Sequence, residues 1–233
     1  MSLKVGILAG LGPAATVLYY RRLMEGLDQH HGAINRPDFI IYSLDSRRMK
    51  ELYNQGLTDK IVDNLVLSLQ CLEKAGCDFG IIACNTVHLF IEAVLPRIQL
   101  PLINLIDTVV DKILKCGSGS LGLLGTTITM DTSLYRAPLE EKGIKVLVPA
   151  ESERKWVDHA ISNDFQQSTI LAASLNRLKD VMLRLKDDGA RQILLGCTDF
   201  PMEAAALNIG IPVHESTEIH VQKTLDKIFT ENV

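Results

Sequence analysis

An internal repeat constrains the fold of this chain more than any other feature, because three landmarks of the first half recur in the same order in the second. A glycine-containing apolar segment comes first, a cysteine that ends an apolar run comes second, and a short proline-containing apolar run comes third. The matching pairs are 5–10 with 121–126, Cys84 with Cys197, and 100–104 with 211–214, each separated by about 110 to 116 residues. Such a repeat predicts two related structural units.

Short runs rich in Ile, Leu and Val alternate with segments of helical periodicity along the whole chain. We expect strands near residues 3–9, 38–44, 79–83, 101–105, 120–125, 144–148, 191–195 and 211–214. We expect helices near 14–30, 57–75, 86–96, 107–116, 130–142, 152–163, 168–188 and 217–229. The strands are continuous apolar runs, as expected when helices cover both faces of a parallel sheet. The predicted class is therefore α/β, with two pseudo-symmetric doubly wound parallel-sheet lobes and a cleft between them.

The repeat also suggests how the chain divides between the two lobes. Each proline-containing strand follows its cysteine segment and could cross over to the other lobe. We therefore expect residues 1–100 and 211–233 to form the first lobe and residues 101–210 to form the second.

Composition excludes several classes of protein. With 47% hydrophobic and 22% charged residues, the 233-residue chain is typical of a globular protein. Its net charge of −4 argues against nucleic-acid or membrane partners, which usually require a basic face. No apolar run approaches the ~20 residues of a membrane span. Because the first residues lead directly into an expected strand, we expect no signal peptide. Five cysteines without CxxC spacing predict reduced thiols in the cytoplasm.

Ligands of doubly wound sheets bind beyond the carboxyl ends of the strands. The residues expected there are rich in hydroxyls, amides and glycine, which provide donors for a carboxylate or a similar small anion. The candidate substrate-binding residues are Gly10, Gly12, Asp45, Arg47, Arg48, Asn85, Thr86, Thr126, Thr127 and Thr198.

The segment from Gly10 to Ala15 matches the G-x-G-x-x-A pattern of dinucleotide-binding turns. However, Pro13 removes an N–H group where a pyrophosphate would need a donor. Asp45, which follows the second strand, also lies well beyond the usual spacing of about 20 residues. The segment is better interpreted as a tight turn that a small ligand approaches, and we expect no cofactor.

Cys84 and Cys197 are the candidate catalytic residues, because each ends a strand and precedes small polar residues. The pattern predicts a strand, a cysteine and then a helix start, whose dipole favours the reactive thiolate. Two such cysteines suggest proton transfer, in which one thiolate removes a proton and the other thiol supplies one. Cys71, Cys77 and Cys116 have no such context and are expected to be inert.

Two other interpretations of the cysteines are weaker. A Cys–His hydrolase with His88 as its base leaves the second cysteine unexplained. A zinc site built from Cys84, His88, Cys197 and His214 lacks the closely spaced ligand pairs of structural zinc, so we expect no metal.

The combination of these motifs resembles the aspartate/glutamate racemase superfamily, and within it the aspartate racemase branch. The residues that carry the resemblance are Gly10-Leu-Gly-Pro13 with Thr16 and Tyr20, Ala83-Cys-Asn-Thr86 with His88, Leu124-Gly-Thr126 with Met130 and Tyr135-Arg136, and Gly196-Cys-Thr198. The resemblance implies a two-lobed enzyme without a cofactor, in which two cysteines remove and return the α-proton of a small amino-acid substrate. It also implies a homodimer.

We therefore expect a cofactor-independent amino-acid racemase, an isomerase that acts on aspartate or glutamate. Two residues depart from the pattern of the family: Asp199 stands where a glutamate is usual, and Gln166 stands where aspartate racemases carry a lysine. Arg47 or Arg48 could bind the side-chain carboxylate in place of that lysine. The alternatives are a hydantoin racemase, a related isomerase or decarboxylase that uses one cysteine, and a non-catalytic two-lobed sensor of small molecules.

Overall fold

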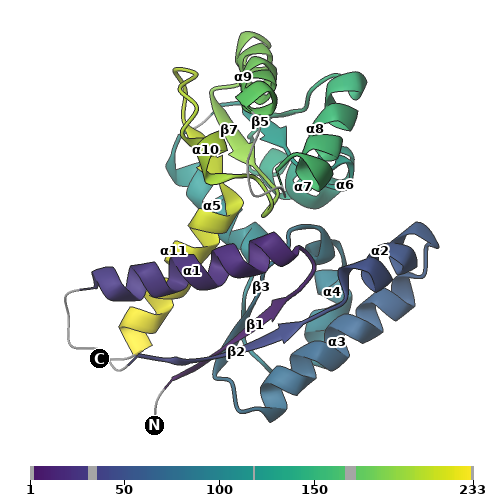
Figure 1. Ribbon diagram of the computed structural model, residues 1–233, viewed down its shortest axis with the longest axis vertical. Helices are drawn as coiled ribbons and strands as arrows, with labels where there is room; N and C mark the ends of the chain where they lie inside the picture. Colours follow the sequence, from purple (N-terminus) through teal and green to yellow (C-terminus); the bar gives the residue numbers. More distant parts are fainter. Residues whose placement is uncertain (1–2, 31–35, 118, 166–171, 232–233) are drawn as a thin grey trace. The chain divides into compact units, whose positions relative to one another are not determined.

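The computed structural model describes residues 3–30, 36–117, 119–165 and 172–231, which fold into two α/β units (Figure 1). Every strand expected from the sequence is present within a few residues. The strands of the described residues are β1 (Lys4–Ala9), β2 (Asp38–Ser43), β3 (Phe79–Ile82), β4 (Leu102–Ile103), β5 (Leu121–Leu124), β6 (Val146–Leu147), β7 (Gln192–Leu195) and β8 (Val213–Glu215).

The strands form two sheets of the same topology. Within the described residues, the first sheet has the order β2-β1-β3-β4 and the second has the order β6-β5-β7-β8. Every pairing in both sheets is parallel. The predicted fold class of two doubly wound parallel sheets is therefore confirmed, and the sequence repeat corresponds to a repeated topology.

The helices differ from the expected ones in four places. The helices of the described residues are α1 (Pro13–Gln29), α2 (Ser46–Asn54), α3 (Thr58–Lys74), α4 (Ile91–Val94), α5 (Leu105–Lys115), α6 (Thr127–Asp131), α7 (Ser133–Glu140), α8 (Glu151–Asn163), α9 (Ala172–Asp187), α10 (Met202–Ala205) and α11 (Ser216–Glu231). Two of them, α2 and α10, were not expected. The helix expected at 86–96 consists of the 3₁₀ helix η1 (Thr86–Phe90), α4 and the 3₁₀ helix η2 (Leu95–Arg97). The helix expected at 130–142 is divided into α6 and α7.

The predicted exchange of strands between lobes is wrong. Unit 1 comprises Met1–Thr108 and His220–Val233, and unit 2 comprises Val109–Ile219. β4 pairs with β3 in the first sheet, and β8 pairs with β7 in the second. The prolines do not prevent this pairing, since the carbonyl oxygens of Pro101 and Pro212 accept hydrogen bonds from Gly80 and Ile193, at 2.8 and 2.9 Å. The helices that follow these strands, α5 and α11, pass from one unit to the other instead.

In unit 1 the first sheet has an apolar core on each face. Val5, Ile7 and Ala9 of β1 point to the face covered by α1 and α11, while Leu8 packs on the face covered by α3 (Figure 1). In unit 2, Leu124 of β5 and Ile193 and Leu195 of β7 pack against α8 and α9. No helix among the described residues has the length and apolarity that crossing a membrane requires.

Candidate active site

The cysteine of unit 1 lies at the carboxyl edge of the first sheet. β1 and β3 run in parallel with Leu8 opposite Ile82, and the Ala83 N–H donates a 2.9 Å hydrogen bond to the Leu8 carbonyl oxygen. Cys84 is therefore the first residue beyond this ladder, at the same edge as Gly10. Its side chain is partly exposed, whereas the next residue, Asn85, is 2% exposed.

The cysteine of unit 2 occupies the equivalent position in the second sheet. Leu124 of β5 lies opposite Leu195 of β7, and the Gly196 N–H donates a 2.7 Å hydrogen bond to the Leu124 carbonyl oxygen. Cys197 is again the first residue beyond the ladder. It is partly exposed, and Thr198 after it is 5% exposed.

The α-helix starts expected directly after the two cysteines are absent from the described structure. Cys84 precedes the 3₁₀ helix η1, and Cys197 is followed by a turn before the four-residue helix α10. Neither segment supplies the long row of aligned peptides from which a helix dipole arises. The helix-dipole argument for thiolate formation therefore does not apply to this chain.

The expected glycine turn of unit 1 is confirmed in detail. Gly10 has a φ of 83°, and a Cβ atom there would lie 2.3 Å from the Leu44 carbonyl oxygen. Thr16 stabilises the turn, because its hydroxyl accepts a 2.9 Å hydrogen bond from the Gly10 N–H and donates to the Gly12 carbonyl oxygen at 3.0 Å. Gly12 is the N-cap of α1, so both glycines shape the backbone beside Cys84.

Asp45 and the two arginines lie where β2 leads into α2. The Asp45 carboxylate is the N-cap of α2, because it accepts hydrogen bonds from the backbone N–H groups of Arg47 at 2.9 Å and Arg48 at 3.4 Å. Both arginine side chains are exposed. Arg48 lines a pocket of about 350 Å³, together with Ser43, Asn64 and other residues of β2, α2 and α3. Asp45 lines the same pocket, where its carboxylate is engaged by the backbone of α2, whereas the Arg48 guanidinium forms no ion pair with another described residue.

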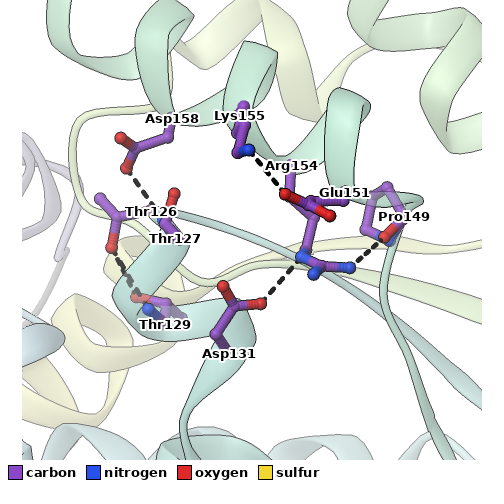
Figure 2. A network of polar contacts seen from close by, with 9 residues as sticks. All are labelled: Thr126, Thr127, Thr129, Asp131, Pro149, Glu151, Arg154, Lys155 and Asp158. Atoms are coloured by element: carbon purple, nitrogen blue, oxygen red, sulfur yellow. Dashed lines mark hydrogen bonds and ion pairs between the residues drawn. The ribbon is translucent and has the colours of Figure 1, made fainter.

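The threonines at the end of β5 belong to a polar network (Figure 2). The Thr126 hydroxyl caps α6 by accepting a 3.3 Å hydrogen bond from the Thr129 N–H. The Thr127 N–H donates to Asp158 Oδ1 at 2.9 Å. The Asp158 carboxylate of α8 therefore already accepts a hydrogen bond from Thr127, a residue that was expected to bind substrate. Nothing in the spacing of the sequence indicated Asp158.

Arg154 of α8 is engaged within the same network (Figure 2). Its Nε lies 2.8 Å from Asp131 Oδ1, and its guanidinium also donates to the Pro149 carbonyl oxygen at 2.8 Å. Gln166, which stands at the expected lysine position, lies outside the described residues.

His88 is buried, and its ring nitrogens face the backbone. Nδ1 lies 2.8 Å from the Cys84 carbonyl oxygen, and Nε2 accepts a 3.3 Å hydrogen bond from the Leu105 N–H. Burial lowers its pKa to about 4, so the ring is neutral at pH 7. These contacts do not place His88 as the base of a Cys–His pair. The described residues contain no group of three His, Cys, Asp or Glu side chains that could hold a metal ion.

The thiol of Cys77 belongs to one of the three cysteines that were expected to be inert. It lies just beyond the end of α3, where burial, followed by the negative charge of Asp78, raises its pKa. A raised pKa disfavours the thiolate, as expected of an inert cysteine.

Comparisons with known proteins extend over almost the whole chain. The family model for Asp/Glu/Hydantoin racemases matches residues 8–224. The broad specificity amino-acid racemase RacX of Bacillus subtilis is 26% identical over 148 residues, which are 61% of this chain and 63% of that protein. A glutamate racemase of Deinococcus radiodurans is 26% identical over 72% of this chain and 57% of its own length. The matches thus span less than two thirds of either relative.

Solved structures match this chain over nearly the whole length of both chains. The crystal structure of an aspartate racemase homologue from Pyrococcus horikoshii has a TM-score of 0.79 at 29% identity, covering 97% of this chain and 99% of that one. An aspartate racemase of Picrophilus torridus has the same fold, with a TM-score of 0.77 at 21% identity over 98% of this chain and 95% of its own. The topology, the paired cysteine positions and the family match lead to one conclusion: this chain belongs to the Asp/Glu/Hydantoin racemase family.

Proposed function

We propose that this protein is a cofactor-independent amino-acid racemase that uses Cys84 and Cys197 as its two acid–base groups. The observation that carries the proposal is the equivalence of the two cysteines. Each is the first residue beyond the ladder of the central strand pair in its own sheet, partly exposed and followed by a buried polar residue. Membership of a racemase family supports the same assignment.

Racemisation requires a proton to leave one face of Cα and another to arrive at the opposite face. One cysteine, as the thiolate, takes the Cα proton and becomes a thiol, which leaves a carbanion stabilised through the adjacent carboxylate. The other cysteine, as the thiol, donates its proton to the opposite face and becomes the thiolate. The pair exchanges roles for the reverse direction, and no redox change occurs. Hydrogen-bond donors that bind the carboxylate stabilise the charge that develops on it.

Incubation with L- and D-amino acids in deuterated water tests this mechanism. The wild-type protein is expected to invert its substrate and to introduce deuterium at Cα. Cys84→Ser and Cys197→Ser should each lower racemisation by orders of magnitude, since a hydroxyl is a far poorer base than a thiolate. Cys71→Ser is the matched control, because this cysteine is exposed on α3.

The surviving cysteine of each mutant provides a sharper test. Hydrogen exchange in Cys84→Ser and in Cys197→Ser should favour substrates of opposite hand. A mutant that racemises at the normal rate would contradict the two-base mechanism and favour a reaction that uses one cysteine. If the wild-type protein racemises only a neutral cyclic substrate, and the two cysteine variants lose that activity, the protein is instead a hydantoin racemase.

An acidic amino acid is the substrate class we propose, with Arg48 as the partner of its side-chain carboxylate. Arg48 lines a pocket, is exposed, and has no carboxylate partner among the described residues. A guanidinium can bind a carboxylate through two parallel hydrogen bonds. Arg47, one residue earlier, is the second choice because it is exposed but does not line that pocket.

Steady-state kinetics of arginine variants test the substrate class. Arg48→Ala should lower kcat/KM for aspartate or glutamate by about 10- to 100-fold, since a hydrogen bond to a charged group contributes about 1.5–3 kcal/mol. Lys50→Ala, which removes an exposed charge from the same helix, is the control. Unchanged turnover of both acidic amino acids in Arg47→Ala and Arg48→Ala would exclude this assignment.

A racemase of neutral or basic amino acids is a second candidate, and Asp158 favours it. Its carboxylate lies beside Thr127 at the carboxyl edge of the second sheet, where it would repel an acidic side chain. RacX, a relative of this chain, is a broad specificity enzyme. Asp158→Asn should then shift the preference towards acidic substrates, and an unchanged preference would exclude this candidate.

A further inference from the structure

Cys84 lies just past the last strand residues of β3, where the ladder of the sheet no longer supports the backbone. The last ladder bond in this stretch is donated by the N–H of Ala83. A proton-transfer group must nevertheless be held precisely, because a displacement of about 1 Å costs on the order of 10²-fold in rate. Some other contact has to fix the Cys84 peptide.

The contacts of His88 supply such support, and they determine its tautomer. Leu105 can only donate its N–H, so Nε2 of the ring must carry the lone pair. The proton of the neutral ring is then on Nδ1, and it is donated to the Cys84 carbonyl oxygen 2.8 Å away. His88 therefore connects the Cys84 peptide to the first residue of α5.

A second buried histidine fixes the far end of this connection. His220 of α11 has Nε2 2.8 Å from the Ile103 carbonyl oxygen and Nδ1 3.0 Å from the Tyr19 hydroxyl. A carbonyl can only accept, so this ring carries its proton on Nε2 and accepts from Tyr19. Between the two anchored residues lies Asn104, whose side chain accepts the Ile106 N–H at 2.8 Å. Residues 103–105 are thus held from both sides.

We propose that His88 is a positioning residue for Cys84, whose Nδ1–H···O=C bond fixes the Cys84 peptide against the junction of β4 and α5. The inference rests on the proposed function for its kinetic readout, while a chemical readout at the thiol is independent of that function. His88 acts through the backbone of Cys84 and takes no proton from the substrate.

Two isosteric amides separate the two hydrogen bonds of the ring. In His88→Asn, the amide nitrogen occupies the place of Nδ1 and can still donate to the Cys84 carbonyl oxygen. In His88→Gln, the amide lies one bond further out, where it can accept from Leu105 but is removed from Cys84. Tyr19→Phe is the matched control, because it removes a buried hydrogen bond from His220 but leaves the His220–Ile103 and His88–Cys84 hydrogen bonds in place.

Site-resolved alkylation with iodoacetamide, read by mass spectrometry, reports each thiol separately. We expect His88→Gln to change the alkylation rate of Cys84 by about fivefold or more and to leave the alkylation rate of Cys197 unchanged. The same variant should lower kcat by about 10- to 100-fold, with a smaller effect on KM. His88→Asn and Tyr19→Phe should stay within about twofold of the wild type in both readouts.

Two outcomes would overturn the proposal. In the first, His88→Gln has wild-type Cys84 reactivity. In the second, both amide variants change the alkylation rates of Cys84 and Cys197 equally, and their kcat falls in proportion to their thermal stability. This result is expected if His88 has only a structural role. If Cys84 responds as expected but no amino acid is racemised, the positioning role stands and the proposed function fails.

The wild-type protein provides a test that needs no variant. Nitrogen-15 NMR of the histidine rings should show the Nδ1–H tautomer for His88 and the Nε2–H tautomer for His220 at pH 7. An Nε2–H tautomer at His88 would remove the hydrogen bond on which the proposal depends.

Discussion

Mild acid should destabilise unit 1 through its two buried histidines. Burial lowers the pKa of His88 from the ordinary 6.5 to about 4 and that of His220 to about 3. In the unfolded chain both rings regain the ordinary value and bind protons below pH 6.5. Protonation therefore favours the unfolded state, so the free energy of unfolding falls as the pH drops from 6.5 towards 4.

The magnitude follows from proton linkage. Between pH 7 and pH 5 each unfolded imidazole goes from about one quarter to almost fully protonated, while each buried ring gains almost no proton. Each histidine therefore costs roughly 2 kcal/mol of stability and the pair roughly 4 kcal/mol. That is a large fraction of the ~5–15 kcal/mol by which a typical domain is stable. His214 of unit 2 adds a loss in the same direction, because burial, followed by the positive charge of Lys112, lowers its pKa.

Urea unfolding at pH 7, 6 and 5, followed by circular dichroism, measures the effect. Trp156, the single tryptophan, lies in unit 2, so its fluorescence follows that unit separately. In His88→Asn the loss should shrink from roughly 4 to roughly 2 kcal/mol, since one titrating ring is gone. A wild-type loss below about 1 kcal/mol at a constant m-value would refute the reasoning, as would an identical loss in the variant.

Three further predictions concern packing, capping and assembly. Gly26→Ala should destabilise the protein by about 1–3 kcal/mol, because the new Cβ would lie 2.2 Å from Leu225 Cδ1; an unchanged melting temperature would contradict this, and Leu225→Val should restore part of the loss. Asp45→Ala should cost about 1 kcal/mol in urea unfolding through loss of the α2 cap, whereas Asp45→Asn should retain it; equal losses of substrate affinity at unchanged stability would instead favour a binding role. Light scattering should give twice the chain mass of 25.8 kDa if the expected homodimer forms, and a monomer mass would exclude it.

The strands and the edge positions of the cysteines could be predicted because they depend on local patterns. A run such as that of β5 has no polar face, so it fits only a strand covered on both sides. The same local view failed for α2. Only Met49 of this helix is buried, and its start was marked by Asp45, which was interpreted as a ligand residue instead of a cap.

Features that depend on contacts between residues distant in the sequence could not be predicted from local sequence patterns. The proline before β4 suggested a crossover, but the pairing of β4 with β3 is decided by a ladder to residues about 20 positions earlier. From the sequence, His88 was considered as the base of a Cys–His hydrolase and as a zinc ligand, and both interpretations were weak. The positioning role that we propose for His88 depends on Leu105, which contacts it only in the folded unit.

The passage of α11 into unit 1 has a consequence for biosynthesis. Val221, Leu225 and Ile228 of this helix complete the apolar face of the first sheet, yet the ribosome makes them after all of unit 2. Unit 2 is one continuous stretch and can fold as it emerges, whereas unit 1 must wait with one face of its sheet covered only in part, by α1. Domains generally fold in the order of synthesis, and exposed apolar surface in the interval promotes aggregation. The half of the chain that is made first is therefore the half that finishes folding last.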